Sequence, residues 1–391
     1  MPYSFEYLSL VSRVRSSANL AAELRRLIQS GQIQDGEVLP PERFISDQCD
    51  LSRGTVRKAL GELESEGLVT GGQGRLRRVC GPSSAEEKRT QQAIIALMWP
   101  DPQQHWKWQK APGWQCHINR GAMDALENTG KHKLLLDPVL LDENVPMDWL
   151  LNLGVEGVIT DEMTADDPLT VIEMLKYIRR LGLPVVAYSN ELWARMFDRV
   201  VPDHRQGAHQ LTQWLIEQGK TNIQRLWLIR DYTQRPDWLS QRDTGFEQAM
   251  AENGLQAMPP VELILHKPLR SSSKQFDNLK HLIAGNLARL TTEGRKIDTI
   301  MLTTDGDVPA CAAACRVIGK DPQRDIALVG YDNFWHDLPD LQYDSTPPLA
   351  TVDKHNYQAG REMVQLYNER LNGLIQEEIQ VRMIAPELLI L

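Results

Sequence analysis

The stretch Leu51-Ser-Arg-Gly-Thr-Val-Arg-Lys-Ala-Leu60 decides the fold of the N-terminal part of this 391-residue chain. Ser52 is a good helix N-cap residue, and the apolar residues Val56, Leu60 and Leu63 recur at helical spacing. This pattern predicts a helix from about 53 to 66 with one buried face, ended by a glycine at position 67. Two arginines four residues apart, at 53 and 57, then project together from the helix.

The flanking residues complete a winged helix-turn-helix over residues 1–80. Before the central helix, the spacing of leucines predicts a helix over 18–30, and Pro40-Pro41 begins a short second helix anchored by Phe44 and Ile45. After it, residues 68–70 and 75–79 flank a glycine-rich turn, which predicts a β-hairpin, or wing. We expect an α+β domain here.

Such a domain has the side chains to bind DNA. An arginine in the first turns of a helix can make bidentate contacts to guanine in the major groove, and Ser52 and Thr55 can bond phosphate beside the free N–H groups of the helix start. The wing residues Gln73, Gly74 and Arg75 could enter the adjacent minor groove or follow its phosphates. The alternative interpretation is a surface helix with solvated arginines and an ordinary hairpin.

The charge distribution is compatible with this interpretation. The net charge is −9, yet residues 1–90 hold 13 Lys and Arg against 12 Asp and Glu. Between Ser52 and Val79 there are six basic residues and three acidic residues. The chain therefore resembles a compact DNA-binding module joined to an acidic body.

Three ordered motifs resemble the GntR-family winged helix: Leu39-Pro-Pro-Glu-Arg43, the stretch 51–60, and Leu63-Glu-Ser-Glu-Gly-Leu-Val69. The resemblance implies DNA contacts by a set of residues that comprises Arg43, Ser52, Arg53, Thr55, Arg57, Gln73 and Gly74. Two departures stand out. Pro41 occupies a position where the family usually has serine, and Leu76-Arg77 occupies the usual Gly-Thr after the wing turn, which makes the wing contacts less secure than the helix contacts.

Beyond a polar linker at 81–91, residues 92–391 alternate short aliphatic runs with helical stretches, which predicts doubly wound parallel sheets in two α/β lobes. The expected strands are 93–98, 133–136, 157–160, 184–188, 225–229, 261–265, 299–302 and 326–330. The expected helices include 208–217, 241–253, 276–290 and 308–318.

This part resembles the LacI-family effector domain, which is related to periplasmic sugar-binding proteins. The motifs are Val200-Val-Pro-Asp203 with Gly207-Ala208, Arg242-Asp-Thr-Gly-Phe246, Thr303-Thr-Asp305, Asp325–Asp332 and Pro347–Val352. The resemblance implies two lobes, the first about 92–201 plus 332–370 and the second about 202–331 plus the C-terminal strands. The short hinge helix of LacI relatives has no counterpart at 81–91.

In that fold a ligand binds between the lobes, at the carboxyl ends of the strands. The family's ligand residues map onto Arg242 and Asp305, although these two could instead pair with each other. Asp203 and Asp332 are expected mainly at turns or lobe junctions, and Thr304 replaces the usual asparagine. Weaker candidates are Ser189 and Asn190, which follow a predicted strand.

A tryptophan-rich stretch, His105–Trp114, follows the first predicted strand of this region. Trp106 and Trp108 could stack on a sugar ring. They could equally cover an exposed surface or a dimer contact.

The sequence predicts no cofactor, metal or enzymatic activity. It contains no glycine-rich phosphate loop and no nucleophile elbow, and Cys311 and Cys315, at a spacing that could bind metal, have no third ligand nearby. With no apolar run of membrane length and no secretory signal, we expect a cytoplasmic protein bound to the nucleoid through its operator, with no membrane partner.

We therefore predict a transcription regulator, most simply a repressor. It would bind a pseudo-palindromic double-stranded operator as a homodimer, under the control of a small ligand such as a sugar or sugar derivative. A DNA-binding module fused to an enzymatic body is the main alternative, and a secreted solute-binding protein is a third.

Overall fold

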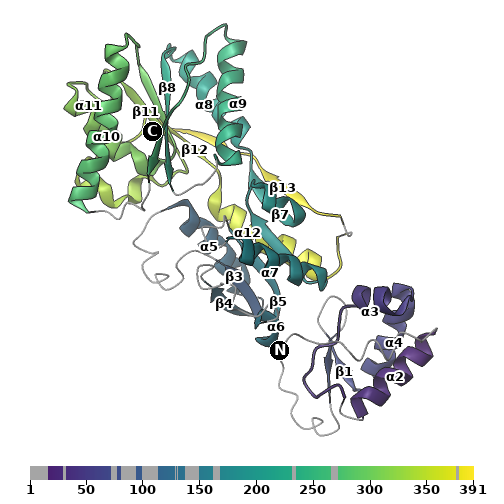
Figure 1. Cartoon of the computed structure of the whole chain (residues 1–391). Coiled ribbons are helices and arrows are strands. Elements are labelled where there is room, and N and C mark those ends of the chain that lie inside the picture. Colours follow the sequence, from purple (N-terminus) through teal and green to yellow (C-terminus); the bar gives the residue numbers. More distant parts are fainter. Residues whose placement is uncertain are drawn as a thin grey trace.

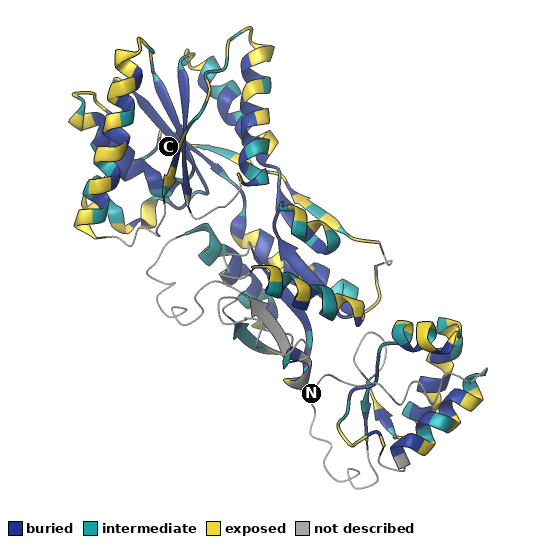
Figure 2. Ribbon diagram, in the orientation of Figure 1, coloured by how far each residue is buried: buried dark blue, intermediate teal, exposed yellow. Residues whose placement is uncertain are grey.

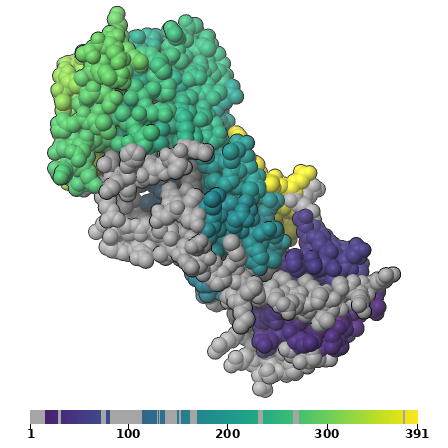
Figure 3. All heavy atoms as spheres, viewed as in Figure 1, coloured from purple at the N-terminus to yellow at the C-terminus, as the bar shows by residue number. Residues whose placement is uncertain are grey.

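The computed structural model describes residues 16–29, 32–71, 77–80, 94–98, 113–127, 129, 131–136, 149–161, 168–230, 235–265, 272–375 and 378–391. An N-terminal helical domain and two α/β lobes follow one another along the molecule (Figure 1). In the space-filling view, the first lobe lies between the N-terminal domain and the second lobe (Figure 3).

The N-terminal domain has the predicted order of elements. Helices α2 (Ser17–Gln29), α3 (Glu42–Cys49) and α4 (Arg53–Ser65) precede the antiparallel strands β1 (Val69–Thr70) and β2 (Arg78–Val79). Val56, Leu60 and Leu63 are fully buried in its core. The turn between α3 and α4 places Asp50 at φ 51°, and Gly67, at φ 74°, follows α4 where the sequence predicts its end.

The first lobe contains a parallel sheet in the order β13-β7-β6-β5-β3-β4. Its strands are β3 (Ile94–Met98), β4 (His132–Leu136), β5 (Val155–Thr160), β6 (Val185–Tyr188), β7 (Asp198–Pro202) and β13 (Val381–Ile384). Helices α5 (Trp114–Glu127) and α12 (Asn356–Leu371) cover one face, and α6 (Trp149–Asn152) and α7 (Pro168–Arg180) cover the other. A 3-10 turn, η3 (Leu192–Met196), precedes β7.

The second lobe contains the sheet β14-β12-β11-β10-β8-β9, parallel except for β14. Its strands are β8 (Ile223–Arg230), β9 (Val261–Leu265), β10 (Thr299–Leu302), β11 (Ala327–Tyr331), β12 (Ala350–Asp353) and β14 (Glu387–Ile390). Helices α8 (His204–Glu217) and α9 (Asp237–Glu252) pack on one face, and α10 (Ser273–Thr292) and α11 (Val308–Val317) on the other. Short 3-10 turns are η4 (Asp305–Asp307), η5 (Trp335–Asp337) and η6 (Pro339–Gln342). Buried strands therefore lie between helices whose outer faces are exposed (Figure 2).

The doubly wound parallel architecture is confirmed, and every predicted strand segment is present with small differences at its ends. The division of the C-terminal residues between lobes needs correction. We expected 332–370 in the first lobe, but β12 pairs with β11 and β14 in the second sheet. We also expected both C-terminal strands in the second lobe, but β13 pairs with β7 in the first sheet. The chain crosses between lobes after β7, after β12 and between β13 and β14. The last two crossings were expected near 331 and 370, and the backbone pairing moves both toward the C-terminus.

Two glycines allow α5 and α12 to pack closely in the first lobe. A Cβ atom on Gly360 would lie 1.9 Å from the carbonyl oxygen of Ile118, and one on Gly121 would lie 1.9 Å from that of Tyr357. Backbone atoms cannot move aside as a flexible side chain can. The two helices therefore require the absence of a side chain at both positions.

We predict that Gly360→Ala destabilises the chain by about 1–3 kcal/mol, because overpacking outweighs the gain in helix propensity. The matched control is Gly285→Ala in α10, where an added Cβ meets nothing within 4 Å. That control should gain about 0.5–1 kcal/mol. Denaturant unfolding followed by tryptophan fluorescence measures both, and equal effects of the two changes would contradict the packing argument.

Candidate nucleic-acid interface and ligand site

The recognition helix α4 begins with a well-formed cap. Ser52 Oγ accepts a hydrogen bond from the backbone N–H of Thr55 at 3.1 Å, and the two hydroxyl groups lie 2.8 Å apart. The cap confirms the predicted role of Ser52 at the helix start. Arg43 and Arg57 are exposed, and Arg53 is half-buried. The helix thus presents hydroxyls and cations at its N-terminal turns while its opposite face is buried in the domain core.

Glu42 connects the recognition helix to the wing strand. Its carboxylate accepts from Arg57 Nε at 3.0 Å and from Arg77 Nη1 at 3.0 Å. Arg77 is largely buried, whereas the Arg57 side chain is 69% exposed. Arg77, at one of the two positions that depart from the family pattern, therefore supplies a structural ion pair, a role that the sequence did not reveal. An exposed pair such as Arg57–Glu42 contributes only about 0–1 kcal/mol, so Arg57 can exchange Glu42 for DNA.

Several predicted residues lie outside the described part of the chain. These are the wing residues Gln73, Gly74 and Arg75, the tryptophans Trp106 and Trp108, and the linker at 81–91.

Arg242 lies on α9 and is only 2% exposed. Its Nη1 donates to the carbonyl oxygen of Thr303 at 2.6 Å, and its Nε donates to Nδ1 of His204 at 3.3 Å. The guanidinium carbon lies 4.6 Å from the ring centre of Trp238 and 3.8 Å from that of Tyr331. Arg242 is therefore rigidly held at the carboxyl edge of the second sheet, where the sequence places a ligand.

His204 is a member of this cluster that the sequence did not single out. It is the first residue of α8, after the chain crosses into the second lobe, and its ring stacks near Trp238. Burial, together with the positive charges of Arg242 and Lys354, holds the pKa of His204 well below its usual value. The ring is neutral, and its Nδ1 acts as an acceptor for Arg242.

Asp305 differs from its expected orientation. It is fully buried, and its carboxylate accepts from the Thr351 hydroxyl at 2.8 Å and from the backbone N–H of Phe334 at 3.1 Å. Burial raises the pKa of Asp305 well above its usual range. Asp305 does not pair with Arg242, whose hydrogen bonds go to Thr303 and His204. A ligand contact to Asp305 would have to displace bonds within the second lobe.

Lys354 and Asp332 form a buried ion pair where the chain crosses back into the first lobe. Lys354 Nζ lies 2.8 Å from Asp332 Oδ1, and the Thr304 hydroxyl donates to the other carboxylate oxygen at 2.8 Å. The ammonium also lies 4.8 Å from the ring centre of Trp114 on α5. Lys354 therefore touches both lobes. The expectation that Asp332 serves a lobe junction is confirmed, whereas Lys354 was not anticipated.

The other junction residues come from the strand end of β6. Ser189 is buried and its hydroxyl accepts from the N–H of Glu191, and Asn190 beside it is also buried. The carboxylate of Glu191, in the first lobe, accepts from the N–H of Asp237 at the start of α9 in the second lobe, at 2.9 Å. Pro236, the N-cap of α9, makes no capping bond with its own side chain, so Glu191 supplies a cap from the opposite lobe.

Asp203 acts at the first crossing between the lobes. Its carboxylate caps α8 by accepting from the N–H of Gln206 at 2.8 Å. This is the turn role expected for it.

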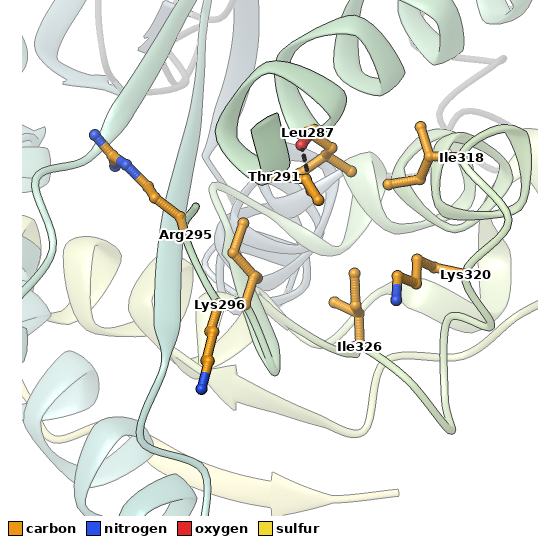
Figure 4. A pocket seen from close by; sticks show the side chains of 8 residues that line it. Leu287, Thr291, Arg295, Lys296, Ile318, Lys320 and Ile326 are labelled. Atoms are coloured by element: carbon orange, nitrogen blue, oxygen red, sulfur yellow. Dashed lines mark hydrogen bonds between the residues drawn. The ribbon is translucent and has the colours of Figure 1, made fainter. Parts of the chain in front are cut away.

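A separate pocket of about 290 Å³ lies at the ends of α10 and α11, distant in the fold from these residues (Figure 4). Leu287, Thr291, Arg295, Lys296, Ile297, Ile318, Lys320 and Ile326 line it. None of the predicted site residues contributes to this pocket.

Within the described ranges, no cluster of three His, Cys, Asp or Glu side chains is arranged to hold a metal ion. Cys311 and Cys315 are buried in the core between α11 and the second sheet. Among the helices of the described ranges, none has both the length and the apolar composition needed to cross a membrane.

Comparison with family models gives two matches. Residues 16–78 match the model of bacterial regulatory proteins of the gntR family, and residues 212–390 match a periplasmic binding protein-like domain. The two matches confirm the resemblances drawn from the motifs.

Two curated relatives are transcription regulators by name. The arabinose metabolism transcriptional repressor of Geobacillus stearothermophilus is 28% identical over 207 residues, which cover 52% of this chain and 54% of the relative. The HTH-type transcriptional regulator CelR of Thermobifida fusca is 23% identical over 235 residues, covering 60% and 62%. The aligned part thus spans less than two thirds of either relative.

A solved structure of the transcriptional regulator CelR in complex with cellobiose resembles most of the chain. The TM-score is 0.57 at 19% identity, and the match covers 90% of this chain and 99% of that one. This similarity supports the two-lobed fold.

The neutral state of His204 predicts a pH dependence of stability. The unfolded chain takes up a proton at this residue below pH ~6.5, while the folded chain does not, so stability is complete above that pH and falls below it. The slope from one such proton is at most about 1.4 kcal/mol per pH unit. His204→Gln should reduce the loss of stability between pH 6.5 and 5, and the exposed control His281→Gln should not. Equal pH profiles for both variants would show that His204 is not held neutral.

Proposed function

We propose that this chain, in which a gntR-family DNA-binding domain precedes a periplasmic binding protein-like domain, is a ligand-controlled transcription regulator and most simply a repressor. One observation carries the proposal. A capped recognition helix with an exposed Arg57 belongs to the same chain as a two-lobe junction that holds a buried arginine, Arg242. The first feature suits DNA, and the second suits a polar ligand.

The DNA half of the proposal assigns base and phosphate contacts to the N-terminal domain. Arg53 and Arg57 read bases, while Ser52 and Thr55 bond phosphate at the helix start, where the dipole favours anions. Arg43 and the wing residues Gln73, Gly74 and Arg75 add contacts to the flanking backbone or minor groove. Because a single small domain binds modestly, we propose a homodimer on a pseudo-palindromic operator in the cytoplasm.

The ligand half places a carbohydrate between the lobes. Arg242 supplies a fork of donors, and Ser189 and Asn190 supply short polar groups from the first lobe. Trp106 and Trp108 remain candidates for stacking on the sugar, and Asp305 for accepting from a hydroxyl. The names of similar proteins support a carbohydrate, since one relative is named an arabinose metabolism repressor and one similar solved structure is a complex of a regulator CelR with cellobiose.

Control of DNA binding follows from the contacts between lobes. Glu191 bonds Asp237 in this arrangement, and Lys354 touches both lobes. A ligand that favours one arrangement of the lobes shifts operator affinity only by its preference between the two arrangements.

The proposed DNA contacts are tested on a DNA duplex that the full chain selects from a pool of random sequences. Arg57→Ala should lose about 1–3 kcal/mol of binding, roughly 5- to 150-fold in Kd, and relax the base preference at one position of each half-site. The control is Arg26→Ala, an exposed arginine on α2 that pairs with Glu23. Fluorescence anisotropy on the selected and on scrambled duplexes gives both values. Equal losses on every duplex would make Arg57 a phosphate contact, and no loss would remove it from the interface.

The sensing half is tested by titrating the complex of chain and selected duplex with a panel of sugars and sugar derivatives. We expect one chemical series to change the operator Kd by about 5- to 150-fold. If none does, the regulator is not controlled by a saccharide.

A further inference from the structure

We propose that the ligand of the lobe junction is an anionic saccharide, a sugar acid or a sugar phosphate, whose negative group binds Lys354 and Arg242. This inference rests on the proposed function, because it assumes that the ligand binds between the lobes. It adds the chemical class of that ligand. It also assigns a role to Lys354, a residue that the sequence motifs did not single out.

Arg242 is buried, and among the residues that the structure describes it has no acidic partner. Its contacts are the neutral carbonyl of Thr303, the neutral ring of His204 and two aromatic faces. The nearby carboxylate of Asp243 is already held by Arg225, at 2.5 Å, and by Arg235. A guanidinium buried without a carboxylate is unfavourable by several kcal/mol, and an anion placed beside it removes much of that cost.

Lys354 adds a second cation to the same region. Arg242 contacts Thr303 and Tyr331 at the ends of β10 and β11. Asp332, the partner of Lys354, follows Tyr331 directly and accepts from Thr304, so the two cations lie at the same strand ends. Lys354 has a single carboxylate partner, Asp332, and an ammonium group has three donors. One donor faces Asp332, and a ligand oxygen can accept another.

Arg242, Lys354 and Asp332 together carry one excess positive charge. His204 is neutral because its pKa is lowered, and burial favours the protonated form of Asp305. The other acids at the junction have partners of their own: Asp161 accepts from Gln115 at 3.2 Å, Glu191 from the N–H of Asp237, and Asp203 from the N–H of Gln206. A carboxylate or phosphate bound to the group of Arg242, Lys354 and Asp332 would balance its charge.

Apolar surface for the sugar ring lies beside these cations. Trp114 lies under Lys354 in the first lobe, and Trp238 lies under Arg242 in the second. Aromatic faces suit the C–H surface of a pyranose or furanose, and the adjacent cations suit a group attached to its end. The combination favours a saccharide that carries an anionic group over a simple inorganic anion.

The test compares matched pairs that differ only in the anionic group. Suitable pairs are galactose with galacturonate, glucose with gluconate or glucose 6-phosphate, and ribose with ribose 5-phosphate, each titrated into the whole chain by isothermal calorimetry. We expect an anionic member to bind at least about tenfold tighter than its neutral parent, a difference of about 1.4 kcal/mol. The carboxylate and phosphate series separate the two sources of charge.

A variant series assigns the preference to Lys354. Lys354→Gln alone leaves Asp332 without its buried partner and can unfold the lobe, so the informative variant combines Lys354→Gln with Asp332→Asn, which replaces the ion pair by a neutral pair. Circular dichroism verifies that the double variant is folded. It should lose the tenfold preference for the anion, and the ratio of the affinities for the two members of each pair is the readout, because removing the ion pair can weaken the binding of both members. The control Lys320→Gln removes an exposed lysine elsewhere on the second lobe and should keep the preference.

The outcomes separate this inference from the proposed function. If a neutral sugar binds as tightly as its anionic partner, the charge argument is wrong, but a sugar-sensing regulator remains. If the double variant keeps the preference for the anion, Lys354 is not its binding group. If no member of either series binds, the sensing half of the proposed function fails, and this inference fails with it.

Discussion

The buried ion pair between Lys354 and Asp332 holds together the strand ends from which the chain crosses into the first lobe. Asp332 ends β11 in the second lobe, and Lys354 follows β12 at the point where the chain crosses to α12 in the first. Asp332 has a backbone φ of 91°, a conformation that costs about 1–3 kcal/mol for a residue with a side chain. Bonds from Thr304, from Lys354 and to the carbonyl of Val352 hold it there. The strained backbone of Asp332, its buried ion pair with Lys354 and the crossing of the chain between lobes are therefore found at the same place.

That coincidence gives the junction two properties that a sensor needs. Its charges are buried, so their interactions are strong and depend on where the neighbouring groups lie. Lys354 also contacts both lobes, Trp114 in the first and Asp332 in the second. A small change in the spacing of the lobes thus has a large electrostatic consequence, and a bound ligand is the natural source of such a change.

Much of the fold could be predicted from the sequence because its signals are local. The recognition helix shows its cap, its apolar stripe and its terminating glycine within 16 consecutive residues, 52–67. Central strands such as β10 and β11 are buried along their whole length and read as continuous apolar runs. The edge strands β13 and β14 carry exposed apolar residues, Met383 and Ile390 among them, and their sheet membership depends on partners far away in sequence. The prediction that the C-terminal strands join the second lobe was therefore right for β14 and wrong for β13.

The two candidate sites show the same contrast between local sequence signals and long-range contacts. The DNA contacts proposed for α4 lie on one element, so spacing alone brings them together. The candidate ligand residues meet only through tertiary structure: Arg242 bonds a carbonyl 61 positions away, and Asp305 turns toward a hydroxyl 46 positions away. No local pattern indicates that Asp305 faces the interior, that His204 lies against Arg242, or that Lys354 adds a charge beside them.

In the function proposed for this chain, one ligand at the lobe junction and one DNA duplex at the N-terminal domain act on a shared equilibrium. Linkage requires that each alters the affinity of the other by the same factor. The direct measurement is the Kd of the ligand, by calorimetry, for the free chain and for the chain saturated with its operator. We predict that the ligand Kd of the free chain and that of the operator-bound chain differ by about 5- to 150-fold. This is the same factor by which the ligand changes the operator Kd. Identical ligand affinities in the two states would contradict it.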